Sequence, residues 1–212
     1  QVVRDIQQSG VAVQQDNVSA KAEQDNHKPV AELSALRQKA VTLVREVLPA
    51  AYLSQKYKAN PFHVTKEHPK AKGNYSTCGE FPAYIVWLLQ GKPEPGRFRP
   101  GTTALQPQGE KRNAWRMPNG IDWPRPGDLY ALCSTDVLDD SVAHVGVMLN
   151  PAGTTWETGD WGQPDVSGGG FAGALVPRTF DKERGTLTGD PTIGPSPRAI
   201  KGWIDLDAYF AK

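Results

Sequence analysis

The chain changes its hydrophobic periodicity once, from a helical pattern to a strand pattern, and this order constrains the fold more than any other feature. Apolar residues recur at helical spacing between Val30 and Pro49, and a second apolar run covers Phe81 to Leu89. From about residue 128 on, short strand-like segments alternate with turns that contain Gly and Pro. Helices followed by an antiparallel sheet are typical of an α+β protein.

The boundaries of the second helix bear on the chemistry of the chain. Thr77 and Glu80 stand in capping-box spacing, which predicts a helix that starts at Cys78 and stops at Gly91. Pro82 conflicts with this start because it would remove a hydrogen bond just past the first turn. A start one or two residues later resolves the conflict and still leaves the thiol at a helix N-terminus.

The rest of the chain is expected to form one domain with loop insertions. Residues 1–28 are polar and contain no aromatic residue, so we expect an arm or linker there and a single domain over 29–212. Strands are expected at about 128–133, 142–149, 154–158, 174–180 and 200–206, in a sheet of five or six strands. The Gly- and Pro-rich stretch 91–127 is expected to be an ordered loop insertion, because Trp115 and Trp123 need burial. The stretch 181–199 is expected to be a loop.

Charge and hydropathy exclude several function classes. The 212 residues carry a net charge of +1 without a block of Lys and Arg, which argues against nucleic acid as a partner. No stretch approaches the roughly 18 apolar residues of a membrane span, so no membrane insertion is expected. The first residues also lack the basic-then-apolar layout of a signal peptide.

The two cysteines, Cys78 and Cys133, could form a disulfide, but their surroundings favour two free thiols. Cys133 ends a strand-like apolar run and is expected to be buried. Cys78 lies where the positive end of a helix dipole and unpaired backbone N–H groups stabilise a thiolate. The sequence therefore points to Cys78 as the nucleophile.

A cysteine nucleophile needs a base, and His144 in the predicted strand 142–149 is the candidate. The histidine in turn needs a polar partner that fixes its tautomer. Glu157, one tight turn later, is the first candidate as a cross-strand neighbour, and Asp160 is the second. For all three acidic or basic residues the alternative is an ordinary structural role.

Substrate contacts are less constrained by the sequence. The backbone N–H of Cys78, with Asn74 or Tyr75 upstream, could stabilise an oxyanion. Trp156 and Trp161 flank Glu157 and could line a substrate cleft, although core packing explains them equally well. His63 and His68 are spaced unsuitably for a zinc site. The chemistry of Cys78 and His144 needs no metal or organic cofactor.

Three short motifs resemble the NlpC/P60 and CHAP superfamily of cell-wall amidases. They are Tyr75-Ser76-Thr77-Cys78-Gly79-Glu80-Phe81, Pro126-Gly127-Asp128-Leu129 and His144-Val145-Gly146-Val147. The resemblance covers residues 74–160 and implies a papain-like fold with helices packed on an antiparallel sheet. It also implies Cys78 as nucleophile, His144 as base and Glu157 as orienting residue. Thr77 departs from the acidic residue common before the NlpC/P60 cysteine, and Glu157 is closer to the CHAP pattern.

We therefore predict a cysteine amidase or endopeptidase that hydrolyses peptide bonds of bacterial peptidoglycan. By analogy it would be an antibacterial effector of type VI secretion or a phage-associated lysin, delivered to the cell envelope. Its partners would be peptidoglycan peptides and an immunity or inhibitor protein. Two alternatives stay open at this stage: a transglutaminase or protein deamidase with the same Cys and His, and a non-catalytic module for cell-wall binding or protein interaction.

Overall fold

In the part of the chain that the structure describes, seven antiparallel strands form one sheet, and six of them close into a barrel. The computed structural model describes residues 32–48, 78–91, 104–164, 171–189 and 196–211. The sheet order is β1-β7-β2-β3-β4-β5-β6, and an additional pairing of β6 with β7 closes the barrel and leaves β1 outside it. The strands are β1 Trp115–Arg116, β2 Leu129–Leu132, β3 His144–Ala152, β4 Thr155–Pro164, β5 Phe171–Asp181, β6 Thr186–Thr188 and β7 Arg198–Ile204.

The closed barrel shows that the predicted α+β papain-like fold, with helices packed on an open sheet, is wrong. Closure depends on β6, where Thr186 pairs with both Asp181 of β5 and Ala199 of β7. This strand lies inside the stretch 181–199, for which the Gly and Pro content predicts a loop. Three residues are too few to show a period-two pattern, so composition alone favours a loop there.

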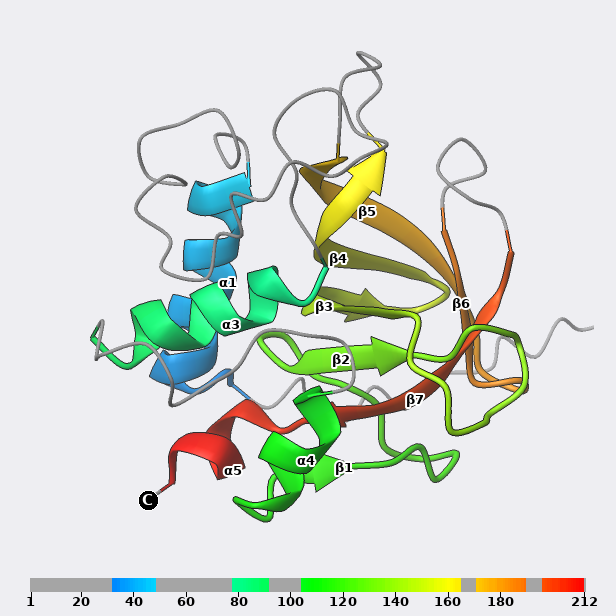
Figure 1. Ribbon diagram of the computed structural model, residues 1–212, viewed down its shortest axis with the longest axis horizontal. Coiled ribbons are helices and arrows are strands. Elements are labelled where there is room, and N and C mark those ends of the chain that lie inside the picture. Colours follow the sequence, from blue (N-terminus) through cyan, green and yellow to red (C-terminus); the bar gives the residue numbers. More distant parts are fainter. Residues whose placement is uncertain (1–31, 49–77, 92–103, 165–170, 190–195, 212) are drawn as a thin grey trace, which may run out of the picture. The chain divides into compact units, whose positions relative to one another are not determined.

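Four helices occur in the described part of the chain: α1 Ala35–Val47, α3 Glu80–Leu89, α4 Leu105–Glu110 and α5 Leu206–Phe210. α1 and α3 contact each other and also β3, as Figure 1 shows in blue and teal. α4 contacts β1 and β7, and α5 contacts α1. The two helices predicted from periodicity are thus confirmed, whereas α4 and β1 lie in the stretch that was predicted as a loop.

Alternation along the strands divides the core into two clusters. Tyr130 and Leu132 of β2 belong to the inner cluster, and Leu129 and Ala131 belong to the outer one. All six barrel strands contribute to the inner cluster, so it fills the barrel: Tyr130, Leu132, Met148, Trp156, Phe180, Leu187, Ile200 and Trp203. The outer cluster packs α1 and α3 onto β2, β3 and β7. Because strand side chains alternate between faces, one sheet serves both clusters.

The boundaries of α3 follow from two residues. The helix begins at Glu80 with Gly79 as N-cap, and no side chain caps it. Pro82 is therefore the third helical residue, where the backbone N–H has no intrahelical partner in any helix. Gly91 follows the C-cap with φ +75°, a conformation that favours glycine. The predicted stop at Gly91 is confirmed, and the start lies two residues after Cys78.

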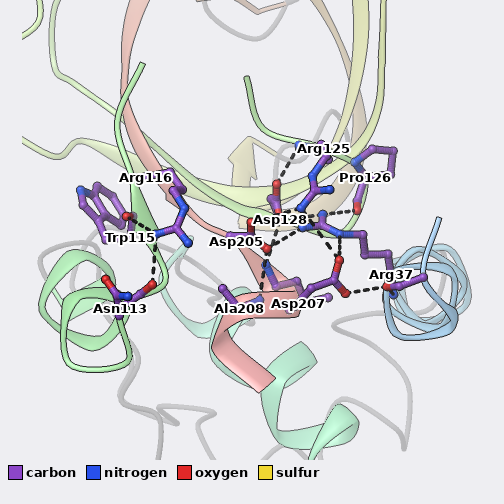
Figure 2. A network of polar contacts seen from close by, with 12 residues as sticks. Arg37, Asn113, Trp115, Arg116, Arg125, Pro126, Asp128, Asp205, Asp207 and Ala208 are labelled. Atoms are coloured by element: carbon purple, nitrogen blue, oxygen red, sulfur yellow. Dashed lines mark hydrogen bonds and ion pairs between the residues drawn. The ribbon is translucent and has the colours of Figure 1, made fainter. Parts of the chain in front are cut away.

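Arg37 joins α1 to the start of β2 and to α5 (Figure 2). Its guanidinium lies 2.7 Å from Asp128, 2.8 Å from Asp205 and 2.6 Å from Asp207, and it is 1% exposed. Asp128 also accepts hydrogen bonds from the backbone N–H of Leu206 at 2.9 Å and of Arg125 at 2.7 Å. This cluster explains the Asp of the Pro-Gly-Asp motif: it is a buried structural anchor.

The described residues from Leu33 on form one compact unit. The predicted arm or linker over 1–28 lies outside the described residues. The strand predictions for β2, β3, β5 and β7 are confirmed within a few residues, and β4 extends past its predicted end at 158 to Pro164.

Candidate functional site

Cys78 lies immediately before the N-cap of α3 and contacts the start of β3. Its side chain is half-buried and packs against the outer apolar cluster. The partner residues of β3 and β4 begin at Val147 and Gly159, so β4 does not pair with the first residues of β3. The backbone N–H of Val145, in this part of β3, hydrogen bonds to the Cys78 sulfur. The thiol thus lies beside the first residues of β3, which have no partner in β4.

His144, the first residue of β3, is buried and lies between Cys78 and Asp160. Its Nε2 is 2.7 Å from Oδ1 of Asp160, and its side chain also hydrogen bonds to Cys78. An ionised carboxylate can only accept, so Nε2 carries a hydrogen and donates it. Nδ1 is then the ring nitrogen that faces the thiol. The hydrogen bond to Asp160 therefore selects the tautomer that can take the proton of Cys78.

Asp160 is fully buried inside the barrel, where four side chains from β2, β3, β4 and β5 donate hydrogen bonds to it. Oδ1 accepts from His144 and from the hydroxyl of Tyr130. Oδ2 accepts from the hydroxyl of Thr158 and, at 3.1 Å, from the guanidinium of Arg178. Burial alone would raise the pKa of Asp160, but the charges of Arg178 and His144 and these hydrogen bonds hold it well below its usual range. Asp160 is a carboxylate at any pH near neutrality.

Gly146 leaves the room that this carboxylate occupies. A Cβ on Gly146 would stand 2.2 Å from Oδ1 of Asp160 and 2.9 Å from the hydroxyl of Tyr130. His144 and Gly146 face the barrel interior because they are two residues apart on one strand. The glycine of the His-Val-Gly motif thus has a steric cause, which is the approach of Asp160 to β3.

The pKa of Cys78 is lowered and the pKa of His144 is raised, so the two values move toward each other. Burial disfavours the imidazolium, but the charge of Asp160 and the hydrogen bonds to Asp160 and Cys78 outweigh it and raise the pKa of His144. Burial also disfavours the thiolate, but the hydrogen bond and charge of His144 and the N–H of Val145 lower the pKa of Cys78. Both shifts increase the share of thiolate beside imidazolium near neutral pH.

This electrostatic arrangement predicts different pH dependences for the two cysteines. Cys133 is a free thiol whose pKa is raised by burial. We expect iodoacetamide to alkylate Cys78 at least about 10-fold faster than Cys133 at pH 7, because the thiolate is the form that attacks. The rate at Cys78 should rise at lower pH than for an ordinary thiol and then level off. Peptide mapping by mass spectrometry between pH 5 and 9 measures both rates, and coincident curves would contradict the assignment.

Glu157, the first candidate for the orienting residue, does not contact His144. It pairs in register with Asn150 and forms an exposed ion pair with Arg45 of α1. A register shift between Met148 and Asn150 displaces the cross-strand neighbours from the positions that a regular hairpin would give. The structure brings the second candidate, Asp160, to His144 instead.

Trp156 and Trp161 do not line a cleft, because both are buried. Trp156 stacks on Phe180 inside the barrel, with ring centroids 3.9 Å apart. Trp161 stacks on Phe81 of α3 at 5.1 Å in the outer cluster. Core packing, the alternative reading, accounts for both tryptophans.

Of the candidates for stabilising an oxyanion, the structure describes only Cys78. Asn74 and Tyr75 lie outside the described residues, so only the backbone N–H of Cys78 remains to be considered. His63 and His68 also lie outside them. In the described part of the chain, no group of three or more His, Cys, Asp or Glu could hold a metal ion.

Sequence reasoning missed the residues that hold Asp160: Tyr130, Thr158 and Arg178. Arg178 is the one that carried a signal. It alternates with Val176 and Phe180 on one face of a strand, and an arginine on an apolar strand face requires a buried partner. Its Nε donates to Thr158 at 2.9 Å, so it holds both Thr158 and the carboxylate.

Comparison of the chain with protein families, with curated proteins and with solved structures found no match. Separately, the described helices include none with the length and apolar character that crossing a membrane requires.

Proposed function

We propose that the chain is a cysteine hydrolase that cleaves amide bonds, with Cys78 as nucleophile, His144 as base and acid, and Asp160 as orienting residue. The observation that carries the proposal is the continuous chain of contacts from the thiol through the imidazole to a buried carboxylate. A merely structural histidine would need neither a carboxylate on one ring nitrogen nor a thiol on the other.

The geometry supports an acyl-transfer reaction in two steps. The Cys78 thiolate attacks the carbonyl carbon, and the tetrahedral intermediate collapses as Nδ1 of His144 gives its proton to the leaving amine. This breaks the C–N bond and leaves a thioester. His144 then takes a proton from a water molecule, the resulting hydroxide attacks the thioester, and the acid product leaves as the Cys78 thiol is restored.

The proposed substrate is a peptide of bacterial peptidoglycan, and the proposed place of action is the cell envelope. This part rests on the motif resemblance to NlpC/P60 and CHAP amidases over residues 74–160. Two features of those motifs have physical causes in the site: the glycine after the histidine makes room for Asp160, and the cysteine precedes a helix. The proposal includes an immunity or inhibitor protein as a further partner.

The test is incubation of purified peptidoglycan fragments with wild-type protein, with Cys78→Ala and, as a matched control, with Cys133→Ala. We expect new peptide ends in mass spectra for the wild type and Cys133→Ala and none for Cys78→Ala, because the Cys133 thiol donates to the carbonyl oxygen of Asp139 rather than to His144. Release of ammonia without new ends would favour a deamidase with the same residues. Intact fragments with every protein would reject peptidoglycan as the substrate.

A further inference from the structure

A cavity of about 360 Å³ lies beside β7, outside the cluster that holds Asp160. An apolar wall and three charged groups line it: Trp115, Met117, Leu138, Asp139, Asp140 and Lys201. Met117 and Leu138 are about half exposed, which is unusual for large apolar side chains. The cavity therefore offers a ligand both apolar contact and charge.

Lys201 is the unusual member of this set, because it is buried and none of the described residues is a close partner of its ammonium. It is 7% exposed, yet its Nζ donates one hydrogen bond, to the carbonyl oxygen of Asp139, at 3.4 Å. Its ion pair with Asp140 is 3.7 Å long. The buried cations Arg37 and Arg178 have partners between 2.6 and 3.1 Å. An ammonium has three donors, and burying it without partners is costly, so Lys201 has capacity for an anion.

The two aspartates do not use up this capacity. The carboxylate of Asp139 accepts from the backbone N–H of Ser141 at 2.8 Å and from its hydroxyl, and only its carbonyl turns to Lys201. The Asp140 side chain is fully exposed, and a solvated carboxylate at 3.7 Å interacts weakly with a cation. A ligand carboxylate would exchange with Asp140 at the ammonium.

The cavity is adjacent to the catalytic strands. Leu132 of β2 pairs with His144 on one side and with Ile200 on the other, and Lys201 follows Ile200 at a register shift. Two strand spacings correspond to about 10 Å, or roughly three residues of extended peptide. The loop that contributes Leu138, Asp139 and Asp140 leads directly into His144. An extended peptide that passes His144 would therefore need about three residues to reach the cavity.

We propose that this cavity binds a carboxylate-bearing residue of the peptide substrate, about three residues from the amide that is cleaved. Lys201 contacts the carboxylate, and Trp115, Met117 and Leu138 contact the apolar part. The inference rests on the proposed function for the identity of the ligand as a substrate. The expected preference of the cavity for a carboxylate depends only on the ammonium of Lys201 and not on the proposed function.

Binding to catalytically silent Cys78→Ala protein tests the proposal. The probes are acetyl-trialanine with a free carboxylate, its C-terminal amide, and acetyl-alanyl-glutamyl-alanine amide. The second probe is neutral, and the other two separate a terminal from a side-chain carboxylate. The Kd of each is measured from the indole N–H signal of Trp115 in NMR titrations. We expect at least one carboxylate probe to bind roughly 10-fold more tightly than the neutral amide.

Three further substitutions in the Cys78→Ala background test whether Lys201 causes the preference for carboxylate. Lys201→Met should remove the preference for carboxylate, Lys201→Arg should retain it, and Asp140→Asn should strengthen it by removing the competing carboxylate. Equal Kd values for all three probes, or an unchanged preference in Lys201→Met, would overturn the proposal. Because no step requires catalysis, a carboxylate preference without any cleavage by the wild type would reject the proposed hydrolase and leave the cavity assignment in place.

Discussion

Replacing His144 with alanine is expected to slow alkylation of Cys78 at pH 7 by roughly 10- to 100-fold and to lower hydrolysis by roughly 10³-fold. In the wild type, His144 supplies both the hydrogen bond and the charge that stabilise the thiolate against burial. Without it, burial and the negative charge of Asp160 both raise the pKa of Cys78. The reactive thiolate then becomes a small fraction at neutral pH.

The measurement is the rate of iodoacetamide labelling at Cys78 as a function of pH, in wild type and His144→Ala. The pH at which labelling rises should be higher in His144→Ala than in the wild type. At high pH the two rates should converge, because Cys78 is then a thiolate in both proteins. Asp160 keeps Tyr130, Thr158 and Arg178 as donors in the variant, so we expect it to fold.

Glu157→Gln is the matched control for this experiment. Glu157, like Asp160, follows His144 within one strand of the chain, but its carboxylate pairs with Arg45 at the surface. The substitution therefore removes a carboxylate that is not part of the site. We expect unchanged labelling of Cys78 and unchanged hydrolysis, because Glu157 contacts neither catalytic residue. Slower labelling in Glu157→Gln than in His144→Ala would reverse the assignment of the orienting residue.

The contrast between Glu157 and Asp160 shows which information the sequence carries about the site. A cysteine before a helix and a histidine in a strand are local features, and both are where the pattern predicts them. The orienting residue depends on the register between β3 and β4, which shifts between Met148 and Asn150. A shift of one residue exchanges the two faces of a strand, and no local pattern records it.

The alternation of side chains along β4 distinguishes Asp160 from Glu157. Trp156, Thr158 and Asp160 are two residues apart and share the inner face, whereas Glu157 lies on the opposite face. If Trp156 belongs to the core, period two places Asp160 on the same buried face of the strand and Glu157 on the other face. The sequence leaves Trp156 open between a cleft and the core, and it favours Glu157 because this residue follows His144 across one tight turn.

Barrel closure could not be predicted for a different reason. The helix and strand patterns specify elements, and β6 is a three-residue strand formed by pairing with β5 and β7. Its residues Thr186, Leu187 and Thr188 gain their strand geometry from neighbours far along the chain, which outweighs the local preference for a loop. The inner cluster, and with it the buried setting of Asp160, depends on this closure.

Replacing Arg37 with methionine is expected to destabilise the protein by about 3–5 kcal/mol, since it leaves a buried carboxylate without its cation. Arg37 is 1% exposed and holds Asp128, Asp205 and Asp207 together (Figure 2). Methionine fills much of the same space, so lost packing contributes little. Equilibrium unfolding in urea at pH 7 measures the free energy of unfolding of both proteins.

The matched control is Arg125→Met, which removes a guanidinium from the same cluster. Arg125 is 54% exposed, and its ion pair with Asp205 is 3.1 Å long. Exposed pairs contribute about 1 kcal/mol or less, so we expect a small change in the free energy of unfolding. Equal losses for Arg37→Met and Arg125→Met would show that burial of the Arg37 pair does not matter.

The pH dependence of the loss identifies Asp128 as its cause. Burial raises the pKa of Asp128 to about 6, and the charge of Arg37 is the largest influence that opposes this rise. A carboxyl group whose pKa is raised by folding is most favourable to the folded state at low pH, and that benefit is lost as pH rises through the folded-state value. Without Arg37 the pKa rises further, so ionised Asp128 costs more at pH 7 than at pH 5. The difference in unfolding free energy between wild type and Arg37→Met should therefore shrink from pH 7 to pH 5, and a constant difference would assign the loss to Asp205 and Asp207 instead.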